Sequence, residues 1–140
     1  MNSEKLTAEQ IERIQKALAS VPFAKLLGIE LETVAPGTAT LSLQITNDLK
    51  QNNGVVHGGA IASLIDSATA FAIISVLPPD EKATTADLTI SYLRPLKEGR
   101  AHSTARVLRA GRRLIVVSAE LVDDAGKLIA TALTTYIKIS

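Results

Sequence analysis

Asp66 is the one ionisable side chain in an otherwise apolar or small stretch that runs from Gly58 to Leu77. A carboxylate inside such a segment costs free energy unless it is satisfied or functional. It can attack a carbonyl carbon, or it can take a proton from a water molecule that attacks instead. No cationic residue lies three or four positions away, which excludes a local ion pair on one helix. The spacing leaves both chemical roles open.

Two glycines, Gly58 and Gly59, open this stretch, and His57 stands just before them. A helix start carries unpaired backbone N–H groups and a partial positive charge. Such groups can stabilise the oxyanion that forms when a carbonyl is attacked. Glycine also permits close approach because it has no Cβ. For an isolated pair of glycines, tight packing or a turn is the better interpretation.

A serine–histidine–aspartate triad is not supported by the neighbouring residues. Ser63 and Ser67 are close in sequence, but Ser67 adjoins Asp66 and points elsewhere on a helix. No Gly-x-Ser-x-Gly motif is present. His102 has no motif context, and we expect it on a strand surface. Two distant histidines and no cysteine do not make a metal-ligand set, so no metal site is predicted.

The elements that position these residues follow from the hydrophobic pattern. Residues 58–77 are predicted to form a long helix, apolar on every face, which ends before Pro78. A first, amphipathic helix is predicted at about residues 6–20, where Thr7 and Gln10 form a capping box. A short helix is predicted between Pro22 and Gly28.

Most of the remaining chain shows the period of two that is typical of strands. A hairpin is predicted from Ile29 to Ile45, followed by strands at about residues 83–93, 101–108, 114–122 and 128–139. This order predicts an α+β domain, residues 1–140, in which an antiparallel sheet of five or six strands curls around the long helix. Because that helix is apolar all round, a partner subunit is a natural cover for its remaining surface.

Composition excludes several classes of function. The net charge of +1 and the aromatic content of 3% argue against nucleic acid binding. About twenty apolar residues could span a membrane, but the central Asp66 and the absence of flanking aromatic or basic anchors argue against it. The charged N-terminal segment has no signal-peptide pattern, so a cytoplasmic location is expected.

Two segments together resemble a known family: the run Asn53 to Gly59, which reads NGVVHGG, and Leu64-Ile65-Asp66. The sequence is similar here to the hotdog-fold acyl-CoA thioesterases of the phenylacetic-acid-degradation type, within the 4-hydroxybenzoyl-CoA thioesterase superfamily. The likeness extends to residues 27–31, 86–95 and 126–132. It implies a long helix wrapped by an antiparallel sheet, and a homodimer with active sites at the interface that often pairs into a homotetramer.

The resemblance also implies roles for individual residues. Asp66 is the nucleophile or general base, the Gly58 amide binds the oxyanion, and His57 organises the helix start. Gln51 stands where relatives commonly carry asparagine, so either Gln51 or the neighbouring Asn52 or Asn53 orients the water or the carbonyl. Thr85 matches a hydroxyl residue that could hold the water. The expected substrate-binding residues are Asn53, Gly59, Tyr92, Arg109, Gly111, Arg112 and Arg113, the arginines facing the phosphates of coenzyme A.

The expected function is therefore hydrolysis of an acyl-CoA or aryl-acyl-CoA thioester to free acid and coenzyme A, with no cofactor besides the coenzyme A of the substrate. The alternatives are a non-catalytic acyl-CoA-binding hotdog protein and a hotdog hydratase. The hydratase is disfavoured because the long helix contains no histidine. Gly58 and Asp66 lie about 12 Å apart along one helix, which favours Gly58 of one chain acting with Asp66 of its partner. The acyl group stays open.

Overall fold

The computed structural model describes residues 5–139, and the ends of the predicted domain, residues 1–4 and 140, lie outside the described part. The helices are α1 (Ala8–Ala19), α2 (Pro22–Leu27) and α3 (Gly58–Ile74), with a short 3-10 turn at Asn47–Leu49. The strands are β1 (Glu30–Ala35), β2 (Thr38–Gln44), β3 (Lys82–Tyr92), β4 (Arg100–Ala110), β5 (Leu114–Val122) and β6 (Leu128–Ile139).

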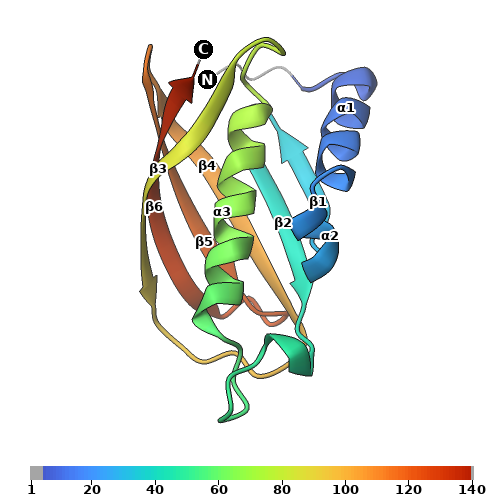
Figure 1. Cartoon of the computed structure of the whole chain (residues 1–140), viewed down its shortest axis with the longest axis vertical. Coiled ribbons are helices and arrows are strands. Elements are labelled where there is room, and N and C mark those ends of the chain that lie inside the picture. Colours follow the sequence, from blue (N-terminus) through green and yellow to red (C-terminus); the bar gives the residue numbers. More distant parts are fainter. Residues whose placement is uncertain (1–4, 140) are drawn as a thin grey trace.

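All six strands form one antiparallel sheet in the order β1-β2-β4-β5-β6-β3. The sheet curls behind α3, and α1 and α2 lie beside the β1 and β2 edge (Figure 1). The predicted α+β architecture of a long helix against an antiparallel sheet is confirmed, with the upper of the two expected strand numbers. Strand β3 follows α3 in the sequence and lies at the opposite edge from β1, so one of its sides has no neighbouring strand among residues 5–139.

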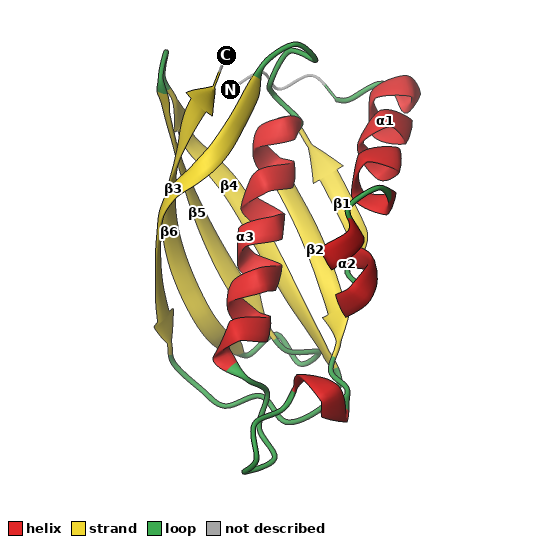
Figure 2. Ribbon diagram, in the orientation of Figure 1, coloured by secondary structure: helices red, strands yellow, loops and turns green. Residues whose placement is uncertain are grey.

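Helix α3 contributes most to the core. Nine of its residues are buried: Ala60, Ile61, Leu64, Ile65, Ala68, Thr69, Phe71, Ala72 and Ile73. Figure 2 shows the sheet on one side of α3 and no other element in front of it. The side chains that stay half-exposed include a row at four-residue spacing, Ala62, Asp66, Ala70 and Ile74. One stripe of the apolar helix, with Asp66 in it, is therefore only partly covered by the rest of residues 5–139.

The helix ends three residues earlier than the predicted residue 77. Ser75 is the C-cap, and its hydroxyl donates to Ala72 O at 2.6 Å and accepts from Gly37 N at 2.8 Å. The N–H of Val76 and that of Leu77 both donate to Ile73 O, which tightens the chain into a turn. Proline disfavours helical geometry in the residue before it, so the turn precedes Pro78.

The two N-terminal helices form where their end signals predict. The Thr7 hydroxyl accepts from Gln10 N at 3.1 Å while the Gln10 side chain accepts from Thr7 N at 2.8 Å, which is the predicted capping box. Gly28 ends α2 with a φ of 77°, in the left-handed region.

No helix within residues 5–139 is long and apolar enough to cross a membrane. The cytoplasmic location stays a prediction.

Two buried serines lie on opposite faces of the sheet. Ser103 pairs with Leu41 and faces the core, and its Oγ is the one enclosed side-chain polar atom in residues 5–139 without a hydrogen-bond partner. Ser42 faces outward, and its Oγ accepts from Arg100 Nη2 at 2.8 Å. An unpartnered hydroxyl in an apolar core lowers stability, whereas a partnered one does not.

We therefore expect Ser103→Ala to raise the free energy of unfolding by about 1 kcal/mol, because it removes an unsatisfied group. Ser42→Ala is the matched control and should lower the free energy of unfolding by about 1 kcal/mol. Urea unfolding followed by circular dichroism measures both. A Ser103→Ala variant that loses as much stability as Ser42→Ala would show that the Ser103 hydroxyl has a partner.

His102 lies half-buried on the outer face of β4 and joins three segments. Its Nδ1 contacts the carboxylate of Glu32, which sits at a bulge in β1, and its Nε2 bonds Asp124 Oδ1 at 2.7 Å in the turn between β5 and β6. The expectation of a strand surface was correct, but the two carboxylates were not predicted. The pKa of His102 is raised, and the hydrogen bond to Asp124 is the largest cause. The hydrogen bond to Glu32 also raises this pKa, whereas burial of the ring lowers it.

This arrangement predicts a pH dependence of stability. Because the folded pKa of His102 is raised, its contribution is fully present below the unfolded value of about 6.5 and is lost as pH rises through the folded value. The melting temperature of the wild type should fall more between pH 6 and pH 9 than that of His102→Gln, which cannot ionise. Equal falls in the two proteins, measured by thermal melts, would contradict a charged His102 bridge.

Candidate active site

The start of α3 leaves one backbone donor open. His57 is the N-cap, and its Nδ1 accepts from Gly59 N at 2.8 Å, while its carbonyl accepts from Ala60 N at 3.0 Å. The N–H of Gly58 makes no hydrogen bond within residues 5–139. The first unoccupied donor of this helix therefore belongs to Gly58, which is the residue expected to bind an oxyanion.

The two glycines meet different neighbours. A Cβ on Gly59 would lie 2.9 Å from His57 Nδ1, so a larger residue would displace the ring that caps the helix. A Cβ on Gly58 would lie 3.4 Å from the Tyr92 ring. Gly59 instead lines a separate cavity of about 270 Å³, together with Phe23 and Ser63. The requirement for glycine at position 59 is thus explained by the helix cap.

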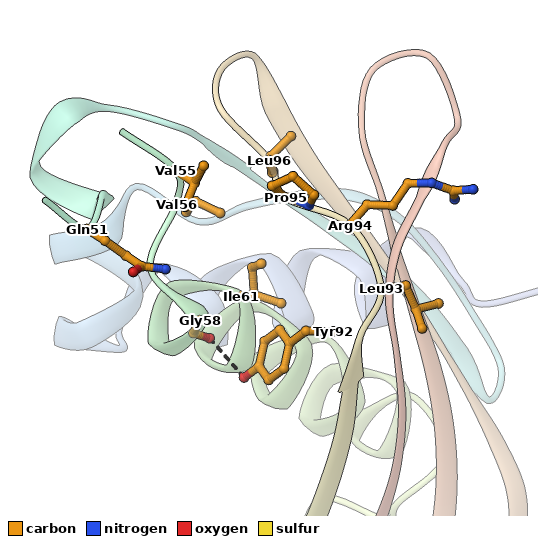
Figure 3. Close-up of a pocket in the computed structure, with 10 residues that line it drawn as sticks. All are labelled: Gln51, Val55, Val56, Gly58, Ile61, Tyr92, Leu93, Arg94, Pro95 and Leu96. Carbon is orange, nitrogen blue, oxygen red and sulfur yellow. Dashed lines mark hydrogen bonds between the residues drawn. The ribbon is translucent and has the colours of Figure 1, made fainter. Parts of the chain in front are cut away.

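A pocket of about 430 Å³ opens beside Gly58 (Figure 3). Three predicted site residues, Gln51, Gly58 and Tyr92, line it, and Tyr92 OH donates to Gly58 O at 3.1 Å. The other lining residues are mostly apolar: Val55, Val56, Ile61, Leu93, Arg94, Pro95 and Leu96. Arg94 points away from the pocket in Figure 3 and donates to Leu128 O at 3.0 Å.

The loop before His57 separates Gln51 from the two asparagines that follow it. Gln51 N donates to Val55 O at 2.8 Å and Gly54, at a φ of 85°, closes a tight turn. Asn52 and Asn53 lie in this turn, exposed, and neither lines the pocket. Of these three residues, Gln51 is the one whose side chain reaches the neighbourhood of Gly58.

Asp66 has a different environment, formed by hydroxyl groups. Thr85 Oγ1 donates to Asp66 Oδ1 at 2.8 Å, and Tyr136 OH approaches the same oxygen at 3.3 Å. Tyr136 was not among the predicted site residues. It lies 70 residues further along the chain, on a strand with ordinary alternation, so no local pattern could have identified it.

A β-bulge in β3 lets both Thr85 and Tyr92 face α3. Seven positions separate these residues, and an odd separation along a regular strand puts side chains on opposite faces. The register between β3 and β6 shifts between Thr85 and Asp87, which leaves Ala86 as the extra residue. Thr85 therefore contacts Asp66 while Tyr92 contacts Gly58, both on the helix side of the sheet.

The predicted site residues fall into three groups within one chain. Gln51, Gly58 and Tyr92 share the pocket, while Asp66 and Thr85 lie further along α3 and β3 and do not line it. Arg109, Gly111, Arg112 and Arg113 form the β4–β5 hairpin, next to Lys138 at the other end of the sheet. Strand β3, eleven residues long, runs from that end to Tyr92, which is about 33 Å at ~3.3 Å per residue. One chain does not bring these groups together.

Similar proteins agree with this architecture. The chain is 31% identical over 148 residues to the medium/long-chain acyl-CoA thioesterase YigI of Escherichia coli K12, covering 94% of this chain and 96% of that protein. It is 30% identical to human acyl-coenzyme A thioesterase 13, covering 87% and 89%. The structure of the E. coli PaaI protein from the phenylacetic acid degradation operon superposes with a TM-score of 0.86 at 27% identity, covering 95% and 96%.

A family-level match covers the segment that holds Gly58, Asp66, Thr85 and the arginine hairpin. The sequence model of the thioesterase superfamily matches residues 53–130, more than half of the chain. This agrees with the resemblance seen in the motif that ends at Asp66. The chain belongs to the thioesterase superfamily.

Proposed function

We propose that this chain hydrolyses the thioester of a medium- or long-chain acyl-CoA, releasing a free acid and coenzyme A. The observation that carries the proposal is Asp66, a carboxylate on the central helix of a thioesterase-family fold, held by hydroxyl groups and left half-exposed. The names of the relatives, a medium/long-chain acyl-CoA thioesterase and an acyl-coenzyme A thioesterase, support this substrate class.

The active enzyme is a homodimer in which β3 of one subunit pairs antiparallel with β3 of the other. Support comes from the unpaired side of β3 and from the half-exposed stripe of α3 that carries Asp66. A two-fold axis at the middle of β3 turns the Tyr92 end of one subunit toward the Lys82 end of its partner. The dimer then collects the three groups that one chain keeps apart, and two dimers associate into a tetramer.

In the assembled site, Asp66 acts on a thioester whose carbonyl oxygen faces the open N–H of Gly58 of the partner subunit. Asp66 either attacks the carbonyl carbon to form an anhydride, which water then hydrolyses, or takes a proton from the attacking water. Both routes pass through an oxyanion, and one backbone donor of this kind contributes about 2.7–4 kcal/mol. The thiolate of coenzyme A leaves and takes up a proton.

The remaining residues position these groups. His57 holds the start of α3 by capping it, and Gln51 lies where its amide can orient water or the carbonyl. The Thr85 hydroxyl donates a hydrogen bond to Asp66 Oδ1, so its oxygen stays available to accept a hydrogen bond from water. Neither route uses a metal ion or a cofactor besides the coenzyme A of the substrate.

The exposed hairpin at the end of β4 binds the phosphates of coenzyme A. Arg109, Arg112 and Arg113 are all exposed, and guanidinium groups suit phosphate oxygens. Gly111 keeps the turn tight, with its N–H on Leu114 O at 2.8 Å. Tyr92 borders the groove from the other subunit, and Gly59 holds the start of α3 through the His57 cap. Asn53 is exposed in the loop before α3 and does not line the pocket.

Asp66→Asn should lower kcat/KM for acyl-CoA hydrolysis by about 1,000-fold, because the amide neither attacks nor takes a proton. A thiol-release assay over alkyl and aryl acyl-CoAs measures this, with circular dichroism and size-exclusion chromatography to verify fold and dimer. The control is Asp80→Asn, an exposed acid before β3, which should keep full activity. A wild type that binds acyl-CoA but releases thiol from no member of the panel would instead be a non-catalytic acyl-CoA-binding protein.

Arg112→Ala combined with Arg113→Ala should raise KM about tenfold and change kcat less than twofold, because the lost contacts hold a part of the substrate that does not react. A double variant matched in charge, Arg13→Ala with Arg106→Ala, removes exposed arginines from α1 and from the middle of β4. That control should leave KM unchanged. If the hairpin variant and the control have the same KM, the hairpin does not bind coenzyme A.

A further inference from the structure

Tyr136 is a buried phenol whose hydroxyl is directed at Asp66. Its side chain is 4% exposed, and its OH lies 3.0 Å from Asp66 O, 3.3 Å from Asp66 Oδ1 and 3.0 Å from Thr69 Oγ1. Burial raises the pKa of Tyr136 to about 12, so the phenol keeps its proton at neutral pH. Because this phenol is a buried donor beside the proposed reacting carboxylate, it helps to decide which carboxylate oxygen reacts.

The hydroxyl protons around Asp66 can be assigned by counting donors and acceptors. Thr69 has one proton and lies 2.8 Å from Asp66 O, so it satisfies that carbonyl. Tyr136 also has one proton, which can go to the same carbonyl or to Oδ1. The carbonyl is nearer, but hydrogen bonds to a charged acceptor are about twice as strong as those to a neutral one. When Asp66 is ionised, the phenol therefore donates its hydrogen bond to Oδ1 and keeps its proton.

The two oxygens of the Asp66 carboxylate are consequently unequal. Oδ1 accepts from Thr85 at 2.8 Å and from Tyr136 at 3.3 Å. Oδ2 accepts no hydrogen bond within residues 5–139, and it is not an enclosed atom lacking a partner, so it reaches solvent. An oxygen that accepts hydrogen bonds from two donors is a poor nucleophile and a poor base, whereas the free oxygen keeps its basicity.

The two donors to Oδ1 lie on neighbouring strands, Thr85 on β3 and Tyr136 on β6. Thr85 and Tyr136 are directly paired in the β3–β6 register, immediately before the bulge at Ala86. Besides Asp66, the charged groups near Tyr136 are Glu81 and Lys82, which line a cavity of about 330 Å³ with it. Glu81 is paired with Lys138 at 3.3 Å, and Lys82 carries no acceptor. Neither Glu81 nor Lys82 therefore competes with Asp66 for the hydrogen bond that the phenol donates.

We propose that Tyr136 is a positioning residue which, together with Thr85, occupies Oδ1 of Asp66 and leaves Oδ2 as the oxygen that acts. The proposal rests on the proposed thioester hydrolysis. Oδ2 of Asp66 then forms either the bond to the acyl carbon or the bond to the proton of the attacking water. Tyr136 does not touch the substrate, and it acts by fixing the orientation of the carboxylate.

Tyr136→Phe removes one donor from the carboxylate, which should raise the pKa of Asp66. The acid limb of the kcat/KM profile should therefore move up by about 0.5–1 pH unit. At the plateau, kcat should fall about three- to tenfold with KM within twofold, because the loss affects the chemical step. Thr134→Val is the control: its buried hydroxyl, on the same strand as Tyr136, donates to Asp87 O at 2.7 Å and does not contact Asp66, so its acid limb should match the wild type.

A titration of Asp66 that needs no activity separates this proposal from the proposed function. Aspartate labelled with ¹³C at Cγ, with the Asp66 signal assigned by Asp66→Asn, should titrate at higher pH in Tyr136→Phe than in wild type. An unchanged midpoint would overturn the role of Tyr136 even if the enzyme is active. Absence of thiol release by the wild type, with a shifted midpoint, would overturn the thioesterase proposal and leave the hydrogen bond established.

If Tyr136→Phe does not fold, fluorotyrosine tests the same contact. A fluorinated phenol is more acidic and donates more strongly, so it should move the Asp66 midpoint to lower pH. The experiment uses a Tyr92→Phe background, since Tyr92 donates to Gly58 O and would also be labelled. An Asp66 midpoint unaffected by fluorination would contradict the proposal.

Discussion

Covering a helix that is apolar on every side is the constraint on which the rest of this structure depends. The sheet buries nine residues of α3, and burial of this kind stabilises the fold by roughly 25 cal/mol per Å² of apolar surface. A single curved sheet reaches only part of the circumference of a helix. The half-exposed stripe around Asp66 is the part of α3 that the sheet does not fully bury, and it is the surface against which we propose that a second subunit packs.

The placement of Asp66 on this stripe links folding to chemistry. A carboxylate facing the sheet core would need its charge compensated at high cost, whereas one facing water would gain no special reactivity. At the border, Thr85 and Tyr136 satisfy one oxygen from the sheet side while the other stays open. The hydroxyls stabilise a charge without neutralising it, which a lysine or arginine in their place would do.

At the start of α3, too, some polar groups are satisfied within the chain while one stays open. The first N–H groups of a helix have no partners within it, and a good cap usually satisfies as many as it can. Here His57 occupies the amides of Gly59 and Ala60 and leaves that of Gly58 open beside a pocket. The helix start is thus stable enough to be well placed, and it still has a donor for a developing negative charge.

Local interactions made a large part of this fold predictable from the sequence by itself. The capping box of Thr7 and Gln10, the C-terminal Gly28 and the alternation in β5 and β6 depend on residues near each other in the chain. Asp66 and Gly58 stood out for the same reason, because an acid in an apolar helix and a glycine pair at its start are visible in one window of sequence.

Only the tertiary structure decided what surrounds those residues. The contact of Tyr136 with Asp66 spans 70 residues, and the Glu32–His102–Asp124 bridge joins three separate segments. The bulge at Ala86 sets which residues of β3 face the helix, and it depends on the register with β6. Strand register follows from packing over the whole sheet, which no short stretch of sequence contains. The separation of the arginine hairpin from Gly58 follows from the same strand order.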